Sequence, residues 1–293
     1  MIIPDHPTIG FVEFIRASAP RDTITILSDH NPHRATFVAK QEELPTRTAQ
    51  DRAFLRTISQ FDAVHIINPL LIQAFEKSTE KKIVFIPNGS RRWASCRPVD
   101  SIFSSRSVVA LSRLTKSKRV DHLIDAFDMV SNRRPDWKLQ ILGRGPDESE
   151  LKKRVQSLGL NGKVVLEGFD PDIDKRFLSA AFMVSASRLE NLSLAYLEAA
   201  GTGTPIVAYD GNATARYFNS EGVDFFSAVP DGNVEALAKA MDRMMQMVED
   251  RDLTVARMSA DAYEFSQRFC PEVIAKHWKQ ALLSLREQET IGT

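Results

Sequence analysis

The sequence predicts an α/β protein with parallel sheets, and three observations support this. Short apolar runs rich in Ile, Val and Phe alternate with longer stretches of helical periodicity, as in sheets covered by helices. The chain has 293 residues, of which 43% are hydrophobic, which is enough for two domains with cores of their own. It contains no run of about 18 apolar residues, so we expect no transmembrane helix.

The expected strands fall into two groups. In the first hundred residues, short apolar runs at 23–28, 63–67 and 82–86 predict a thin sheet. The second group is denser, with strands expected at 108–111, 138–142, 164–167, 182–185 and 205–208. The first of these is followed by a helix, because Val120, Leu123, Ile124, Phe127 and Val130 recur three or four positions apart. Further helices are expected to begin near Glu148, Lys175, Ser193 and Asn233.

The domain boundary is expected near Ser104. Residues 93–106 contain Pro98 and several Ser and show neither the helical nor the strand period, which is typical of a linker. We therefore expect a shortened amino-terminal domain at 1–103 and a second domain at 104–269. A break at Pro271 predicts that the helix at 270–293 leaves the second domain and packs on the first.

The charge balance and the cysteine content argue against a nucleic-acid-binding protein and against metal sites or disulfides built on cysteines. The 38 basic residues balance the 38 acidic ones, so the excess of Lys and Arg typical of a nucleic-acid-binding protein is missing. The two cysteines, Cys96 and Cys270, match no metal-ligand spacing and no disulfide framework. The first residues have neither a basic start nor a long apolar run, so we expect no secretory signal and a cytoplasmic protein. Peripheral contact with a membrane, through apolar residues of the first domain with Arg91 and Arg92, remains an alternative.

The loop and helix after the strand at 182–185 are the most informative stretch. Ser193 is a suitable N-cap, and the backbone N–H groups after it would face a ligand from the positive end of a helix dipole, which favours phosphate. Glu190 precedes this point and Glu198 follows it. Ionised carboxylates there would accept hydrogen bonds from the hydroxyl groups of a sugar or a ribose. The alternative is an exposed loop Glu and a helix Glu paired with a neighbouring cation.

Cations follow the strand at 108–111. Arg113, Lys116, Lys118 and Arg119 lie at the carboxyl end of a predicted strand, where open α/β sheets bind their ligands. Arg offers a bidentate fork and Lys a compact charge, so a pyrophosphate would suit them. Alternatively, Lys116 and Arg119 are solvated surface charges.

Glycines occupy two other strand ends. Gly143-Arg-Gly145-Pro146 follows the strand at 138–142, and Gly168 follows the strand at 164–167. Each signal is weak alone, since any tight turn uses glycine. Their position at the same edge of one sheet supports a common ligand site.

Together these residues resemble the retaining glycosyltransferases of family 4, which have the GT-B fold of two facing Rossmann-like domains. The resemblance is fullest from 108 to 240. It rests on the following matches: Arg113-Leu114 with Lys118, Asp121-His-Leu-Ile124, Pro135-Asp136-Trp137, Gly143-x-Gly145-Pro146, Leu158-Gly159-Leu160, Gly168, the pair Glu190 and Glu198, and Gly203-Thr-Pro205. Ile86-Pro-Asn-Gly89 and 265–285 resemble the end of the family's first domain and its closing helix.

The resemblance implies a reaction and a role for each matching residue. A hexose would pass from a nucleotide diphosphate sugar, UDP favoured over GDP, to a glycan, polymer or lipid, without a metal or any other cofactor. Three residues would be catalytic: Arg113 and Lys118 at the diphosphate, and Glu190 near the reacting carbon. The implied substrate-binding residues are Glu198 at the ribose, Ser193 and Leu194 at the phosphate or sugar, Gly168 and Phe169 at the base, and Gly143 and Asn191 beside them.

The sequence departs from the family pattern in several places. Asn191 stands where Gly is usual, Ser112 replaces a frequent Gly, and 211–216 lacks the usual Gly-Pro-x-Glu. Residues 1–20 show neither the first strand nor the Gly-rich turn of the family. A partner subunit or a second copy of the chain could supply this missing part of the first domain. On this side, His30 and His33 are the polar candidates, and His30 could hydrogen-bond the transferred sugar, although surface turn histidines are the alternative. We expect His65, within a strand, to be a core residue.

Two other functions remain open at this point. One is a noncatalytic nucleotide-sugar or glycan-binding subunit that needs a partner chain, which the short first domain favours. The other is a nucleotide-sugar epimerase or hydrolase of the same fold. The presence of Arg113, Lys118, Glu190 and Glu198 together favours a transferase, because a scaffold has no need of all four.

Overall fold

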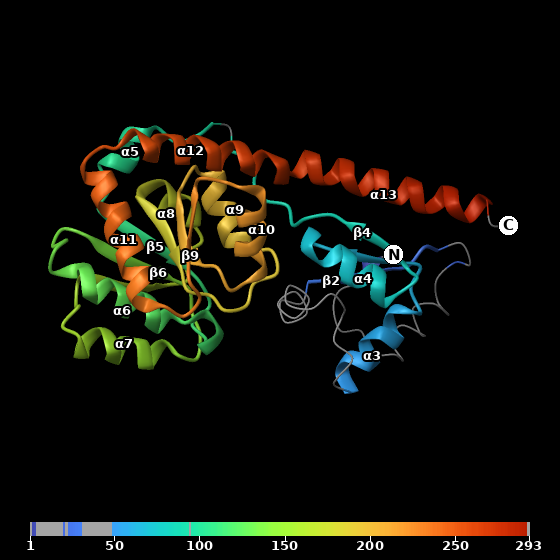
Figure 1. Ribbon diagram of the computed structural model, residues 1–293, viewed down its shortest axis with the longest axis horizontal. Coiled ribbons are helices and arrows are strands. Elements are labelled where there is room, and N and C mark those ends of the chain that lie inside the picture. The colour runs from blue at the N-terminus through green and yellow to red at the C-terminus, as the bar shows by residue number, and fades with distance from the viewer. Residues whose placement is uncertain (1, 4–19, 21–22, 31–48, 94, 292–293) are drawn as a thin grey trace. The chain divides into compact units, whose positions relative to one another are not determined.

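The computed structural model describes residues 2–3, 20, 23–30, 49–93 and 95–291, in two compact units. The first unit comprises residues 1–89, 190–192 and 271–293, and the second comprises 90–189 and 193–270. Figure 1 labels their helices and strands. Within the described residues no helix has the length and apolar character that crossing a membrane requires.

The first unit is built on a small parallel sheet in the order β1-β2-β3-β4. Its elements are β1 Ile2–Ile3, β2 Ile26–Asp29, α3 Ala49–Ile58, β3 Ala63–Ile66, α4 Ile72–Ser78, β4 Lys82–Phe85 and α13 Pro271–Ile291. Strand β1 was not expected from the sequence, because two residues are too few to show a period; it is defined by its pairing with β2. His33 and most of residues 1–20 lie outside the described part.

Helix α13 covers one face of this first sheet. Successive residues of a strand point to opposite faces, so Ile26, Ala63 and Val84 share a face of the three adjacent strands. They are buried in one apolar cluster with Leu285 of α13, and Trp278 packs against it. The last helix of the chain therefore completes the core of the first unit.

The second unit has six parallel strands in the order β10-β9-β8-β5-β6-β7. Its elements are α5 Val99–Phe103, β5 Ser107–Leu111, α6 Val120–Ser131, β6 Lys138–Leu142, α7 Glu148–Ser157, β7 Val164–Gly168, α8 Ile173–Ser179, β8 Phe182–Ser185, α9 Leu194–Gly201, β9 Ile206–Tyr209, α10 Ala213–Glu221, β10 Phe226–Val229, α11 Val234–Glu249 and α12 Leu253–Ser266. Sequence order runs outward from β5 to β7 on one side and from β8 to β10 on the other. The order of strands thus reverses between β5 and β8, which is where doubly wound sheets bind ligands.

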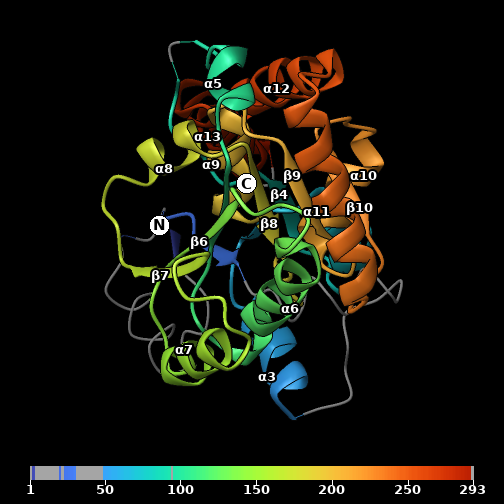
Figure 2. The same ribbon diagram turned by 90° about the vertical axis from the view of Figure 1, so that its left-hand side faces the viewer.

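Helices flank this six-stranded sheet in two groups. Helices α6 and α11 pack against each other, and α9 packs against α12 (Figures 1 and 2). Trp137, Phe127 and Phe182 are fully buried in the core. The predicted fold class, with parallel sheets and a short first one, is confirmed.

The expected linker has regular structure of its own. Val99–Phe103 forms α5, whose Ile102 and Phe103 are buried. Arg97 is 6% exposed, and its guanidinium donates to the carbonyl oxygens of Phe177 and Ala180 at 2.9 and 2.7 Å. These contacts attach the stretch to the second unit, so the division between the compact units falls after Gly89 rather than near Ser104.

Candidate functional site

Backbone hydrogen bonds join the loops that follow β5, β6 and β7. Ser112 N donates to Leu142 O at 2.9 Å, and Leu114 N donates to Arg144 O at 3.0 Å. Gly143 N donates to the carbonyl oxygen of Gly168 at 2.7 Å. The main chain alone therefore fixes this part of the sheet edge and leaves the side chains there available for a ligand.

Two glycines are required by the close approach of these loops. Gly143 has φ +132°, and a Cβ atom on it would lie 1.9 Å from the carbonyl oxygen of Ser112. A Cβ atom on Gly145 would lie 2.2 Å from Leu114 O. Both distances are far below van der Waals contact, so no side chain fits. Gly168 has φ +75° and is followed by Phe169, which is 69% exposed at the end of β7.

Lys118 connects the loop after β5 with the loop after β8. Its Nζ lies 3.5 Å from the carbonyl oxygen of Leu189, and Arg188 N donates to Ser117 O at 2.9 Å. Arg113 is exposed on the same β5 loop. Two of the predicted cations, Arg113 and Lys118, therefore follow β5 at the reversal point of the strand order, and Lys118 approaches the loop after β8.

The other two predicted cations pair with carboxylates elsewhere. Lys116 Nζ lies 2.5 Å from Glu150 Oε2 on α7, and Arg119 Nη1 lies 2.7 Å from Asp231 Oδ1. Arg119 adopts left-handed backbone geometry, with φ +49°, just before α6. The Lys116 side chain is 70% exposed, which fits the alternative of a surface charge, whereas the Arg119 side chain is 17% exposed and lies between Asp231 and the ring of Tyr209.

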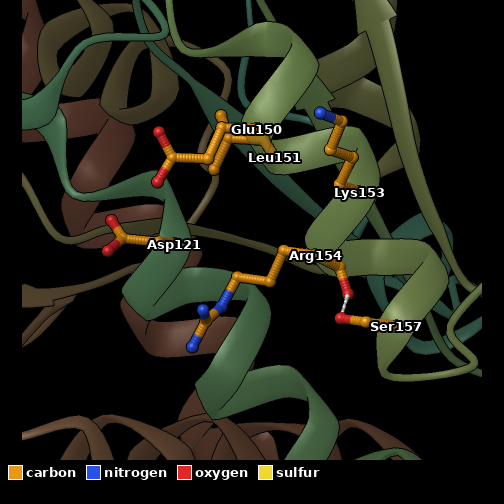
Figure 3. A pocket seen from close by; sticks show the side chains of 6 residues that line it. All are labelled: Asp121, Glu150, Leu151, Lys153, Arg154 and Ser157. Atoms are coloured by element: carbon orange, nitrogen blue, oxygen red, sulfur yellow. Dashed lines mark hydrogen bonds between the residues drawn. The ribbon is translucent and has the colours of Figure 1, made fainter.

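A hollow of about 280 Å³ lies between α6 and α7, and Glu150, the partner of Lys116, lines it (Figure 3). Its lining consists of Asp121 from α6 and, from α7, Glu150, Leu151, Lys153, Arg154 and Ser157. Glu150 pairs with Lys116, and Arg154 Nε lies 2.5 Å from Asp125 Oδ1. Two of its charged groups, Glu150 and Arg154, are thus paired with neighbouring side chains, and the Arg154 pair joins α7 to α6.

Helix α9 begins immediately after Ser193, as predicted. The Ser193 hydroxyl makes no capping hydrogen bond; instead Ser193 N donates to Thr214 Oγ1 at 2.9 Å. A helix leaves its first N–H groups without carbonyl partners in the helix, and here these include Leu194 and Ala195. Leu194 is 50% exposed, so this positive end of the helix is open to solvent.

Asn212 and Thr214 support the loop and the first residues of α9. Neither was predicted from the sequence as a site residue. Asn212 is fully buried, accepts from Ala215 N at 3.0 Å and donates to Ser187 O at 3.0 Å. It thus caps α10 and holds the loop after β8 at the same time. An Asn three positions after a strand and directly before an Ala-Thr-Ala run is an N-cap signal that could have predicted α10.

Glu198 is half-buried in α9, about one turn from Leu194. Burial raises the pKa of its carboxyl group; nearby Asp174 adds to the rise and Arg91 opposes it. Arg91 itself forms an ion pair with Asp174. Glu198 therefore lies near the middle of α9, close to one cation and one other carboxylate.

Residues 190–192 belong to the first compact unit. Asn68 Nδ2 donates to Asn191 O at 2.6 Å, and Asn88 Nδ2 donates to Leu192 O at 3.0 Å. Asn191 is buried and Glu190 is half-buried. The chain segment that carries the predicted catalytic Glu190 is therefore held through its backbone carbonyl groups.

His30 follows β2 in the first unit and is exposed. Its Nε2 lies 2.8 Å from Ser28 Oγ, which also lies 2.7 Å from His65 Nδ1. His65 is buried, as expected of a core residue, but it is hydrogen-bonded on both ring nitrogens. Among the described residues, no group of three or more His, Cys, Asp or Glu is arranged to hold a metal ion.

Comparison with known proteins identifies the family of the chain. Residues 104–263, more than half of the chain, match the family described as glycosyl transferases group 1. The chain belongs to this family. The match covers β5 to most of α12, which includes the loops around Lys118 and Ser193.

Two curated relatives are much longer than this chain. An exopolysaccharide phosphotransferase from Streptomyces coelicolor is 30% identical over 274 residues, 91% of this chain and 27% of that protein. A poly(glycerol-phosphate) alpha-glucosyltransferase from Bacillus subtilis is 28% identical over 179 residues, 61% of this chain and 26% of that protein. The chain spans about a quarter of the length of these relatives.

Solved structures show the GT-B fold for this chain. Anabaena HepE in complex with UDP has a TM-score of 0.75 at 20% identity, over 97% of this chain and 78% of that one. The pneumococcal O-GlcNAc transferase GtfA in complex with UDP and GlcNAc has a TM-score of 0.72 at 17% identity, over 94% of this chain and 55% of that one.

Proposed function

We propose that the chain is a retaining hexosyltransferase that uses a UDP-sugar donor and a glycan, polymer or lipid acceptor. The observation that carries this proposal is the 3.5 Å approach of Lys118 Nζ to Leu189 O. It brings a cation of the β5 loop to the loop before α9, at the reversal of strand order. A diphosphate there would meet Lys118, Arg113 and the N–H groups of α9 together.

In the proposed reaction these fixed charges stabilise the departing nucleotide. As the bond between sugar and phosphate breaks, negative charge grows on the diphosphate, and Lys118 and Arg113 would balance it in place of an essential metal. Glu190 would contact the sugar near its reacting carbon. The leaving phosphate oxygen would take the proton of the acceptor hydroxyl on the same face, so that the anomeric configuration is retained.

Glu198 would hold the ribose hydroxyl groups of the donor. An ionised carboxylate accepts two hydrogen bonds from neighbouring hydroxyl groups, and those bonds would lower the raised pKa of Glu198 again. Phe169, exposed after Gly168, would lie against the base. The choice of UDP is supported by the UDP complexes of HepE and GtfA, which share this fold.

Calorimetry with UDP tests the donor site. Lys118→Ala and Arg113→Ala should each weaken UDP binding by about 10- to 100-fold, because each removes a charge-assisted hydrogen bond. Lys116→Ala is the matched control on the same loop: its ammonium group pairs with Glu150, so affinity should change less than about twofold. If wild-type protein binds no UDP, the proposal is wrong.

Turnover tests the catalytic assignment separately. Glu190→Gln should keep UDP affinity and lose sugar transfer, since it removes a charge at the sugar and leaves the diphosphate contacts intact. Transfer that continues at the wild-type rate in both Glu190→Gln and Lys118→Ala would show that these residues are not catalytic.

A second candidate is a donor-binding subunit that works with a partner chain. It is favoured by the match to a crystal structure of a GtfA/B complex, with a TM-score of 0.72 at 18% identity, over 95% of this chain and 56% of that chain. This candidate predicts UDP binding without transfer by the isolated chain. Transfer by the isolated chain to any acceptor would contradict it.

A further inference from the structure

Arg119, the residue after Lys118, has a backbone conformation that is rare for a residue with a side chain. Its φ and ψ are +49° and +45°, in the left-handed region, where a Cβ atom crowds the following carbonyl oxygen. Among the described residues, Arg251 is the other non-glycine residue with a positive φ. Arg119 stands between the 3-10 turn Lys116–Lys118 and the start of α6, so its torsion angles set the direction of the turn that carries Lys118.

The side chain of Arg119 is attached to the loop after β10. Its Nη1 donates to Asp231 Oδ1 at 2.7 Å and its Nη2 donates to Asp231 Oδ2 at 3.5 Å, so two N–H groups face one carboxylate. The guanidinium carbon also lies 5.9 Å from the centre of the Tyr209 ring, at the end of β9. Because the Arg119 side chain is 17% exposed, water and salt screen this ion pair less than they screen a fully exposed one.

Both partners of the Arg119 side chain are fixed by further contacts. Asp231 N donates to Asp210 Oδ1 at 3.0 Å, which joins the loops after β9 and β10. Tyr209 is fully buried, and its hydroxyl oxygen lies 3.0 Å from Nδ1 of His122 in the first turn of α6. The left-handed residue is therefore attached to the carboxyl ends of two strands outside its own loop.

The turn that carries Lys118 has a second attachment, to the loop after β8. Ser117 O accepts a hydrogen bond from Arg188 N at 2.9 Å, and Lys118 Nζ lies 3.5 Å from Leu189 O. The turn is thus held from one side by the loop after β8 and from the other by the contacts of Arg119. If Arg119 adopted a right-handed conformation, the peptide that joins it to Lys118 would rotate relative to α6 and direct the ammonium group elsewhere.

We propose that Arg119 and Asp231 are positioning residues, whose ion pair holds the left-handed backbone of Arg119 and so keeps the Lys118 ammonium group directed at the donor diphosphate. The ion pair offsets the free-energy cost of the left-handed conformation. Strain of this kind persists only where the surrounding contacts impose it, and it is concentrated at functional sites. The diphosphate as ligand rests on the proposed function, whereas the link between the ion pair and the position of Lys118 does not.

Calorimetry of UDP binding to the full-length chain tests the link, with glycine as the rescuing residue. Arg119→Ala removes the ion pair and keeps a Cβ atom, so residue 119 should leave the left-handed region and UDP affinity should fall about tenfold. Arg119→Gly also removes the ion pair, but glycine adopts a positive φ without strain, so affinity should fall only about threefold. Adding Arg119→Gly to Asp231→Ala should likewise recover most of the loss that Asp231→Ala causes alone.

Arg251 provides the matched control for these variants. It also has a positive φ, +54°, and pairs with a carboxylate, that of Asp100, but it lies between α11 and α12. Arg251→Ala should therefore change UDP affinity less than about twofold. An equal loss of affinity in Arg251→Ala and Arg119→Ala would overturn the proposal, because general destabilisation would then be the cause. Equal losses in Arg119→Ala and Arg119→Gly would also overturn it, because the backbone conformation would not be the link.

Crystal structures of the ligand-free variants separate this proposal from the proposed function. In Arg119→Ala we expect a negative φ at residue 119 and a Lys118 Nζ that no longer approaches Leu189 O, whereas Arg119→Gly should keep the wild-type φ and the approach. If the wild type binds no UDP but Lys118 moves in this way, the proposed function fails and the positioning of Lys118 by the ion pair stands. If the wild type binds UDP and Lys118 stays in place in Arg119→Ala, the positioning role is wrong and the proposed function stands.

Discussion

The carboxyl edges of the two sheets are held in different ways. In the second unit, the loops after β5, β6 and β7 are joined by main-chain hydrogen bonds, such as that between Gly143 and Gly168. In the first unit, one main-chain bond, from Ile86 N to Ile66 O at 3.1 Å, is supplemented by side chains: Ser28 Oγ lies 2.7 Å from His65 Nδ1, whose Nε2 lies 2.8 Å from Ile86 O. We therefore expect an added side-chain atom to destabilise the carboxyl edge of the second sheet. The carboxyl edge of the first sheet should be destabilised when a hydrogen-bonding side chain is removed.

Gly143→Ala should have the largest effect. Its new Cβ atom would meet a backbone oxygen, Ser112 O, at 1.9 Å, and its φ of +132° suits only glycine. We expect a loss of about 3 kcal/mol or more in the unfolding free energy of the second unit, measured by urea unfolding. Gly162→Ala is the control: its φ of +79° is also positive, but nothing lies within 4 Å of the added atom, so about 1 kcal/mol is expected. Equal losses in the two variants would show that close approach is not the cause.

His65→Phe should have the next largest effect, in the first unit. It keeps a ring against Trp278 but leaves the buried Ser28 hydroxyl and the Ile86 carbonyl without their His65 partner. We expect a loss of about 2 kcal/mol, read from faster hydrogen exchange in β2, β3 and β4. His277→Gln, on an exposed position of α13, should change exchange there by less than about 0.5 kcal/mol. If hydrogen exchange in these strands is unchanged in His65→Phe, side chains do not stabilise the carboxyl edge of the first sheet.

Acidification should act in opposite directions through His65 of the first unit and Glu198 of the second. The pKa of His65 falls from its ordinary 6.5 to about 4 on folding, so between these values the unfolded chain binds more protons. The stability of the first unit therefore falls as pH drops through this window, by at most about 3 kcal/mol. Glu198 has a raised pKa, so it favours the folded second unit as pH falls towards and below that value. Hydrogen exchange corrected for intrinsic rates at pH 6.5 and 4.5 checks this, and His65→Phe should remove the loss in the first unit.

Ser112→Ala should have the smallest effect. The Ser112 hydroxyl donates only to the carbonyl oxygen of the next residue, Arg113, while its backbone N–H makes the bond to Leu142. Since the substitution leaves the main-chain hydrogen bonds in place, we expect the free energy of unfolding in urea to fall by less than about 0.5 kcal/mol. A loss above 1 kcal/mol would show that side chains also hold the edge of the second unit.

The sequence predicted the second sheet better than the elements around it. The limits of Phe182–Ser185 were correct because its first three residues are a buried apolar run, and those of Lys138–Leu142 because Leu139, Ile141 and Leu142 are buried. Edge strand β10, Phe226–Val229, was missed because its central Ser227 and Ala228 are partly exposed and the run has no clear period. Helix α5 was taken as part of a linker because only Ile102 and Phe103 mark its buried side.

For the candidate site, local sequence could place residues at strand ends but could not show their partners. Lys116 and Lys118 have the same local context, yet one pairs with Glu150 and the other approaches Leu189. That difference depends on α7 and on the loop after β8, which are distant in the chain. The roles of Ser28 and Thr214 likewise depend on strands and helices brought together only by folding.

The main-chain bonds between the loops of the second unit have a consequence for how this edge opens. Ser112, Leu114 and Gly143 each donate an amide to a neighbouring loop, so no single loop can separate from the sheet without breaking bonds in the next. Their amide protons should exchange with solvent together, as one cooperative unit, rather than with the individual rates of surface turns. A ligand bound to any one of these loops would then slow exchange in the others, including loops that it does not touch.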